Sequence, residues 1–271
     1  MRTLVSTSSG RHSTSKICST LGVPRSSYYY LPVKHIEDEE IVKAVENSFK
    51  ESFRTYGTPR IREDLKALGH NVSRLRIGRI MIAKDLVSCY TKKKKPKVKT
   101  RVNTSSHPNL VARQFDGRKQ HEVVVSDTTY IAISDKWHYL CSMLDLSRRA
   151  ILSSCVAKSR DTSLVTNSLY NMNIDLREID VFHTDRGSEF NSKAVDEILD
   201  AFKIKRSLSQ KGTPIDNAVI ESFFKTVKIE FINRHKFTNI ESFLEGWNKY
   251  VYWYNNKRRH SSLGYQTPLV A

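Results

Sequence analysis

The sequence lacks long apolar runs, closely paired cysteines and an N-terminal charged segment followed by an apolar stretch. No run approaches the roughly 20 apolar residues that cross a bilayer, which argues against a membrane protein and against export. The four cysteines form no CxxC pair and stand beside no histidine pair at zinc-finger spacing, so we expect ordinary thiols in a reducing cytoplasm. Apolar residues make up 39% of the chain, which excludes a disordered protein and predicts globular domains.

Acidic residues are also scarce, at 28 Asp and Glu against 45 Lys and Arg, for a net charge of +17. The imbalance lies almost wholly in residues 1–120, which hold 25 basic and 10 acidic residues, whereas residues 121–271 hold 20 and 18. This division predicts a part that binds a polyanion and a separate part that carries out chemistry. A basic solubilising tail is the alternative, and charge alone does not separate the two.

The first 90 residues are predicted to be a small helical region that binds DNA. Residues 1–15 have no apolar period and are expected to be poorly ordered. A short helix, a turn at Gly22 and a second helix from near Ser26 would make a helix-turn-helix, although two helices packed only for stability fit the pattern better. Further helices are predicted over 37–52, from apolar residues spaced four apart, and over 59–68.

The next helix begins after Ser73, a residue type that caps helix N-termini. Its period places three apolar side chains inward, Leu75, Ile80 and Met81, and three arginines outward as candidate DNA contacts, Arg74, Arg76 and Arg79. Residues 91–101 are too basic to enter a core, with seven Lys or Arg in eleven, so 91–120 is predicted to be a linker. Its lysines can also lie along a phosphate backbone: Lys92, Lys93, Lys94 and Lys95.

Residues 121–271 change to a pattern of short β-rich and helical segments. Strands are predicted over 122–133, 137–146, 150–157, 179–183 and 204–208, and helices over 162–172, 191–202, 216–233 and 239–255. The order βββαβαβα fits an α/β, ribonuclease-H-like catalytic domain: a mixed five-stranded sheet with helices on both faces.

Three carboxylates stand out against this pattern. Asp127 interrupts a Val- and Ile-rich strand, where a carboxylate is costly unless it is paired or bound to metal. Asp185 ends a predicted buried strand, where open α/β sheets place ligands, and its turn with Gly187 aims the carboxylate outward. Glu221 follows after 35 intervening residues on a helix. Each taken alone is compatible with a structural or surface role, but the three together predict a metal site.

The helix that carries Glu221 is predicted to present two lysines, Lys225 and Lys228, on the same face. Its opposite face forms an inward apolar stripe made of Val219, Ile220, Phe223, Phe224, Val227 and Phe231. One helix therefore offers a metal ligand beside two candidate DNA contacts. The alternative is a pair of lysines on a solvated helix face.

With these motifs the chain resembles the OrfB transposases of the insertion-sequence-three family, whose catalytic domain is shared with retroviral integrases. The resemblance extends from about Ser15 to Pro268. It rests on segments 56–61, 69–72 and 79–81 in the helical part, and on 127–131, 137–140, 145–148, 183–190, 216–224 and 254–268 in the catalytic part. Many members have a tryptophan three residues before the first Asp, where this chain has Val124.

The resemblance implies that Asp127, Asp185 and Glu221 are the catalytic residues and bind two divalent ions when DNA is present. The ions are normally Mg²⁺, with Mn²⁺ as a substitute. They bridge the scissile phosphate, activate water or a 3′-hydroxyl for in-line attack and stabilise the leaving oxygen. It also implies DNA-end contacts for Lys225 and Lys228, while His183 and Asn217 are expected to orient the carboxylates.

The implied partners are DNA, as the terminal inverted repeats of the element and a target, a further copy of the chain, and an OrfA-type partner or fusion. The implied location is the bacterial cytoplasm, at the nucleoid. Two other functions remain open at this point. The first is a nuclease of the same fold that cuts without joining; the 254–268 segment argues against it. The second is a non-catalytic DNA-binding regulator, which would not need all three carboxylates.

Overall fold

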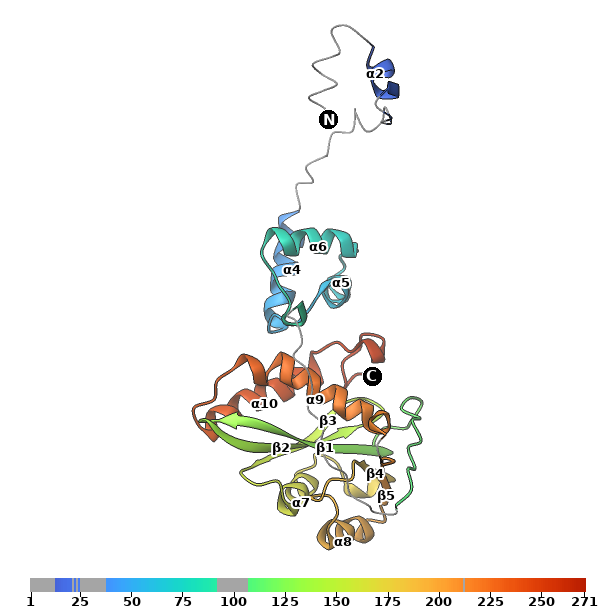
Figure 1. The fold of residues 1–271 in the computed structure, drawn as a ribbon, viewed down its shortest axis with the longest axis vertical. Coiled ribbons are helices and arrows are strands. Elements are labelled where there is room, and N and C mark those ends of the chain that lie inside the picture. The colour runs from blue at the N-terminus through green and yellow to red at the C-terminus, as the bar shows by residue number, and fades with distance from the viewer. Residues whose placement is uncertain (1–12, 21, 23, 25–37, 92–106, 212) are drawn as a thin grey trace. The chain divides into compact units, whose positions relative to one another are not determined.

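The computed structural model of the chain describes residues 13–20, 22, 24, 38–91, 107–211 and 213–271 (Figure 1). Residues 1–42 form one compact unit and residues 43–271 another. In the first unit the short helix α2 (Thr14–Thr20) agrees with the first predicted helix. The second helix predicted near Ser26 and the lysines at 92–95 lie outside the described residues.

A group of short helices precedes the sheet in the second unit. They are α4 (Glu39–Glu51), α5 (Thr58–Ala67), α6 (Arg74–Ala83) and the 3-10 turn η1 (Cys89–Thr91). Ser73 caps α6 as predicted, because its hydroxyl accepts a hydrogen bond from the Arg76 backbone N–H at 3.2 Å. The inward position of Leu75 was wrong: its side chain is 68% exposed and Ile77 is buried instead. Ile77 lies on the same stripe as Ile80 and Met81, and Leu75 does not.

The catalytic part is built on a mixed sheet with the strand order β3-β2-β1-β4-β5. Strands β1 to β3 pair antiparallel, and β4 and β5 continue the sheet in parallel from β1. The strands are β1 (Val123–Ile133), β2 (Lys136–Asp145), β3 (Ile151–Ala157), β4 (Val181–Thr184) and β5 (Lys205–Leu208). The predicted ribonuclease-H-like fold is confirmed.

Helices cover both faces of this sheet (Figure 1). One face carries α7 (Thr162–Tyr170) and α8 (Lys193–Ala201), and the other carries α9 (Ala218–Glu230) and α10 (Ile240–Asn256). Four 3-10 turns join these elements: η2 (Leu176–Glu178), η3 (Pro214–Asn217), η4 (Ile232–Arg234) and η5 (Ser261–Leu263). The helix predicted over 216–233 is shorter, because its start forms η3 and its end leaves helical geometry at Phe231, with φ −127°.

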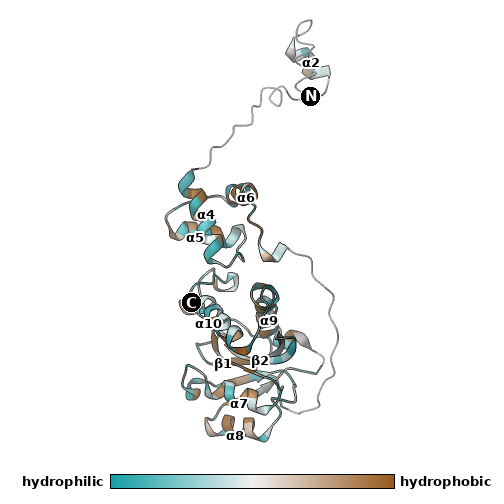
Figure 2. Cartoon of the chain, turned by 90° about the vertical axis from the view of Figure 1, so that its left-hand side faces the viewer, coloured by the Kyte–Doolittle hydropathy of each residue, from teal (hydrophilic) through white to brown (hydrophobic). Residues whose placement is uncertain are grey.

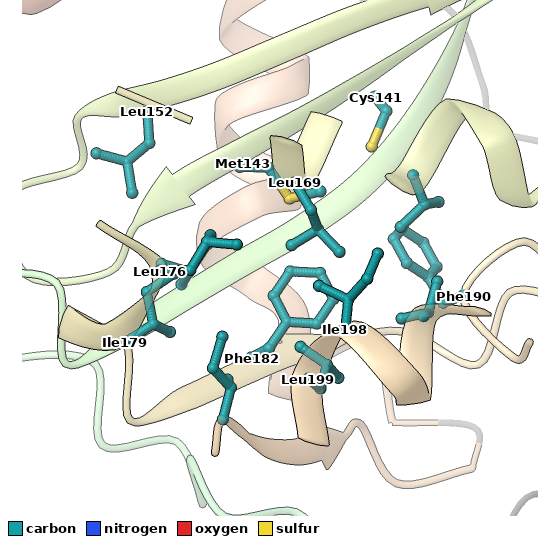
Figure 3. Close-up of a cluster of buried hydrophobic side chains, with 14 of the residues drawn as sticks. Cys141, Met143, Leu152, Leu169, Leu176, Ile179, Phe182, Phe190, Ile198 and Leu199 are labelled. Atoms are coloured by element: carbon teal, nitrogen blue, oxygen red, sulfur yellow. The ribbon is translucent and has the colours of Figure 1, made fainter. Parts of the chain in front are cut away.

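The core between the sheet and α7 and α8 is apolar and closely filled (Figure 3). Phe182 on β4 and Phe190 face each other at 6.5 Å between ring centroids, and Ile198 and Leu199 of α8 pack beside them. Hydrophobic colours gather in the strands between the helices (Figure 2). Burial of these side chains, at roughly 25 cal/mol per Å², holds the strand ends in place. In the described part of the chain, no helix is both long and apolar enough to cross a membrane.

The C-terminal segment folds back after α10 and buries an ion pair. Arg258 donates two hydrogen bonds of 2.8 Å to the carboxylate of Glu230, the last residue of α9. The hydroxyls of Tyr90 and Tyr250 donate to the same carboxylate at 2.6 and 2.9 Å. The backbone N–H of Arg259 donates to the Tyr56 hydroxyl at 2.7 Å. The tail therefore ties the end of α9 to α10 and to the residues around α5.

Candidate functional site

Asp127 and Asp185 meet at the point where β1 and β4 stop pairing. The parallel register ends with Ser126 opposite Thr184, so the next residue on each chain is an aspartate. Neighbouring strands run about 4.8 Å apart and paired residues point to the same side, which brings the two carboxylates together. The turn predicted after β4 is present, because the Gly187 N–H donates to Oδ1 of Asp185 at 2.8 Å.

The pair is strained electrostatically. Burial, the charge of Asp185 and that of Glu189 raise the pKa of Asp127 to about 8, against the hydrogen bond from the Thr128 N–H. Burial and the nearby Glu189 also raise the pKa of Asp185 above its ordinary value. Two acidic groups that resist ionisation side by side are typical of a site that takes up positive charge.

A third carboxylate near the pair, Glu189, was missed as a site residue by the sequence reasoning. It is buried, and its Oε1 accepts hydrogen bonds from the Thr128 hydroxyl at 2.8 Å and from Nε of Arg160 at 2.6 Å. Its Oε2 is buried without a hydrogen-bond partner. A Cβ on Gly187 would come within 2.5 Å of that oxygen, so the glycine leaves the space that the carboxylate fills.

Glu189 belongs to the 183–190 segment that the sequence singled out, but nothing local marks it as buried. Its contacts come from Thr128 on β1 and from Arg160, which precedes α7. The guanidinium of Arg160 is also within electrostatic reach of Asp127 and Asp185. Arg160 therefore offsets part of the negative charge of all three carboxylates.

Glu221 stands apart from the two aspartates. It is exposed in the first turn of α9, a helix that packs against β1. Among the described residues, no group of three His, Cys, Asp or Glu side chains is close enough together to hold a metal ion. The structure thus brings Asp127 and Asp185 together and leaves Glu221 outside ligand distance of the pair.

The predicted inward stripe of α9 is largely confirmed, with Ile220, Phe223, Phe224, Val227 and Phe231 buried and Val219 half-buried. Of the two lysines on the other face, Lys225 is exposed and Lys228 is half-buried. The Lys228 ammonium lies 4.4 Å from the centroid of the Tyr130 ring. Burial lowers the pKa of Lys228, and the opposite charge of Asp127 partly offsets this. The amine of Lys228 therefore lies over Tyr130, within electrostatic reach of Asp127.

His183 and Asn217 occupy buried positions beside the site. The ring of His183 contacts the Ser207 hydroxyl at 2.8 Å and the Asp216 carbonyl at 3.2 Å, so it joins β4 to β5 and to η3 and contacts no carboxylate. Burial lowers the pKa of His183 to about 4, which keeps the ring neutral. Asn217, just before α9, has a buried Oδ1 without a hydrogen-bond partner.

The arginines predicted to contact DNA line α6. Arg74 and Arg79 are exposed, and Arg76 is half-buried and has a partner. None of the three takes part in the site of Asp127 and Asp185. All three lie on α6 in the helical part.

The chemistry of the pair fits a divalent cation. Asp127 and Asp185 offer hard oxygen donors, and the raised pKa of Asp127 together with the unpartnered Oε2 of Glu189 reflects negative charge without full compensation. Mg²⁺ prefers such oxygen ligands and retains waters, so a site with two close carboxylates suits it. Glu221 is the further carboxylate that α9 can supply.

Comparisons with known proteins identify the families of two parts of the chain. Residues 117–214 and 202–268 each match an integrase core domain, and residues 36–95 match an HTH-like domain. The chain is 31% identical over 243 residues to the transposase for insertion sequence element IS904 of Lactococcus lactis, covering 87% of this chain and 94% of the relative.

Two further relatives are similar over nearly their whole length. The insertion element IS600 uncharacterized 31 kDa protein of Shigella sonnei is 30% identical over 268 residues, which cover 93% of this chain and 96% of that protein. The putative transposase InsK for insertion sequence element IS150 of Escherichia coli K12 is 27% identical over 252 residues, covering 91% and 89%.

Proposed function

Because the chain belongs to the insertion-sequence transposases with an integrase core domain, we propose that it cuts and joins the ends of its element with Asp127, Asp185 and Glu221. The enzyme class is that of DDE-type polynucleotidyl transferases, and the substrate is DNA. The observation that carries the assignment of the residues is the meeting of Asp127 and Asp185 at the end of the β1–β4 ladder. The position of Glu221 on α9, which packs on β1, supports its role as the third member.

Each residue of the proposed site has its own role. Asp127, Asp185 and Glu221 would hold the divalent ions, two of them with DNA bound. Mg²⁺ or Mn²⁺ held there would lower the pKa of the attacking water or hydroxyl and neutralise developing charge. The Gly187 N–H holds Asp185 in its turn, and Glu189 with Arg160 holds Thr128 next to Asp127. Lys228 and Lys225 bind phosphates of the DNA end.

A strand-transfer assay with labelled element ends tests this function. Cleavage followed by joining to a second duplex supports the transposase. Cleavage without joining would instead indicate a nuclease of the same fold, and binding without either reaction would indicate a DNA-binding regulator. The flanking DNA of the gene supplies the inverted repeats to be tested as ends.

Binding of Mg²⁺ to the DNA-free protein is expected to be weak and to depend on pH. The pKa of Asp127 is raised to about 8, so at lower pH a proton occupies the carboxyl and must leave before a cation binds. The apparent affinity should rise by up to tenfold per pH unit until about pH 8 and then level off. Calorimetry in two buffers of different ionisation enthalpy measures the released proton. Tight binding without proton release would contradict the proposed site.

Replacing Lys228 by Ala is expected to reduce end processing while the protein stays folded. The variant loses a phosphate contact and an ammonium–ring contact with Tyr130 worth about 0.5–1 kcal/mol. The defect should be larger at high salt, where the remaining charge contacts hold DNA less well. Cleavage rate against salt, with melting temperature, measures this. Lys193→Ala, at an exposed lysine of α8, is the control. Equal cleavage by both variants would mean that Lys228 does not contact the DNA.

The helical part and the basic segment have roles in the same proposal. Residues 1–90, with Arg74, Arg76 and Arg79 on α6, bind the terminal repeats, and the 91–120 segment with Lys92–Lys95 follows the backbone as a linker to the catalytic domain over 121–271. An OrfA-type partner or fusion and a second copy of the chain complete the assembly on DNA. The protein would then act at the nucleoid, where its substrate lies.

A further inference from the structure

Two aromatic side chains are exposed side by side near the aspartate pair. Tyr130 of β1 is 57% exposed and Trp137 of β2 is 62% exposed. Their ring centroids lie 5.2 Å apart, with the rings at 88° to each other. The register pairs Tyr130 with Tyr139 and Ala132 with Trp137, so both rings stand on the same face of the sheet.

This aromatic pair lies next to the proposed catalytic residues. Tyr130 follows Asp127 by three residues on the same strand, which corresponds to about 10 Å. β4 pairs with β1 only as far as Ser126, and on that side β1 next pairs at the isolated bridge of Ile133 to Phe237. Tyr130 and Asp127 are three residues apart and so point to opposite faces of the strand. Lys228 links them, because its ammonium lies 4.4 Å from the Tyr130 ring centroid and is within electrostatic reach of Asp127.

The two rings have no evident role in holding the fold. The chain has three tryptophans, and the other two, Trp247 and Trp253, are buried in the aromatic layer of α10. Exposed apolar residues that occur singly are common on protein surfaces. A contacting ring pair with a lysine over one member is different, because ring faces beside a cation are the elements with which proteins hold unpaired nucleotides.

We propose that Trp137, with the Tyr130 ring packed against it, stacks an unpaired base of the DNA strand that lies over Asp127 and Asp185, while Lys228 binds the adjacent phosphate. This inference rests on the proposed function and adds a ligand to it. Lys228 covers a face of Tyr130, so the larger and more exposed ring of Trp137 is the one left to stack on a base. The positive charge of Lys228 complements a phosphate, and the rings complement a base of any sequence.

The occupant is an unpaired nucleotide and not a paired one. A base inside a duplex has both faces covered by its neighbours, so it offers no face to Trp137 unless it leaves the stack. A single-stranded overhang at a duplex end offers free faces and carries phosphates at the spacing of a normal backbone. The site should thus distinguish DNA ends with an overhang from blunt ends of the same sequence.

Tryptophan fluorescence provides a direct readout, because Trp137 is the exposed indole of the three. The wild-type protein is titrated with a duplex that has a short single-stranded overhang and with the blunt duplex of the same sequence. The part of the emission that dissolved iodide quenches comes from the exposed Trp137. We expect the overhang DNA to quench this part, and the blunt duplex to quench it less. Trp137→Phe should lose this quenching and keep most of the affinity.

Affinity measurements on matched variants complete the test. Trp137→Ala should weaken binding of the overhang DNA by about tenfold and leave binding of the blunt duplex unchanged, because one base stack is lost. Tyr170→Ala, at an exposed aromatic residue at the end of α7, is the control and should change neither affinity. Melting temperatures establish that each variant is folded.

The failures of the two proposals are distinguishable. Equal loss of affinity for overhang and blunt DNA in Trp137→Ala, or no loss for either, overturns the stacking inference, and strand transfer by the wild type would then still support the transposase function. A wild-type protein that neither joins nor cleaves element ends overturns the proposed function, whatever Trp137 binds.

Discussion

Asp185→Asn is expected to abolish cleavage and joining together while DNA binding and folding are kept. The Asn side chain has nearly the same shape, and its carbonyl oxygen can still accept the hydrogen bond from the Gly187 N–H. What it lacks is the charge that holds a divalent ion. Such ions supply several kcal/mol of transition-state stabilisation, which corresponds to a loss of about a thousandfold or more in rate.

Asp185→Asn should lose activity without losing thermal stability. The pKa of Asp185 is raised by burial and by the nearby Glu189, so the ionised carboxylate is less favourable in the folded protein than in water. Removing it relieves repulsion with Asp127, and we expect the melting temperature of the variant to equal or exceed that of the wild type. A functional site that costs stability is the signature that separates a catalytic carboxylate from a structural one.

The measurements are a gel assay of labelled element ends, fluorescence anisotropy for DNA binding and thermal unfolding. Asp200→Asn, at an exposed carboxylate of α8, is the matched control and should behave as wild type in all three. Joining at a wild-type rate by Asp185→Asn would refute the assignment of the site. A large drop in melting temperature would mean that Asp185 serves the fold.

The second large effect concerns the buried ion pair of Glu230 and Arg258. Arg258→Met is expected to destabilise the protein by about 3–5 kcal/mol, because it leaves the Glu230 carboxylate buried without its partner. Burial raises the pKa of Glu230, but the charge and hydrogen bonds of Arg258 outweigh it and hold that pKa below the ordinary value. In the variant this balance is lost, and only the hydroxyls of Tyr90 and Tyr250 and the more distant Arg60, at 3.8 Å, remain near the charge.

Urea unfolding of two further variants separates the charge from the packing. Glu230→Gln combined with Arg258→Met should recover part of the lost stability, because no unpaired charge is then buried. Lys249→Met removes an exposed ion pair with Glu245 on α10 and should cost no more than about 0.5 kcal/mol. If Arg258→Met unfolds at the same urea concentration as Lys249→Met, the ion pair does not stabilise this part of the fold.

This ion pair also explains the tail segment that the sequence marked as specific. Arg258, together with the neighbouring Arg259, reaches back to α9 and to Tyr56 near α5. Glu230 ends the helix on which Glu221 and Lys228 lie. Loss of the pair should therefore disturb the position of α9, and with it the two residues for which we propose roles in DNA cleavage.

The sequence alone determined which elements form and where the aspartate pair lies. Helix caps, strand alternation and turn residues act between positions a few residues apart, so the cap at Ser73 and the order of strands and helices were predictable. Asp127 and Asp185 were predictable too, because each stands at a marked place on its own strand. The local pattern nevertheless gave one wrong result on α6. It predicted that Leu75 is buried, whereas packing buries Ile77 and leaves Leu75 exposed.

Only the tertiary structure decided which distant side chains share a neighbourhood. The Thr128–Glu189 and Glu230–Arg258 contacts join positions 61 and 28 residues apart, and Lys228 reaches Tyr130 from another element. No periodicity predicts such pairs, because their geometry depends on how β1, α9 and the tail pack. The same packing leaves Glu221 exposed and outside ligand distance of the two aspartates. Charge and residue type establish what a side chain can bind, and the fold establishes which other side chains are near it when it does.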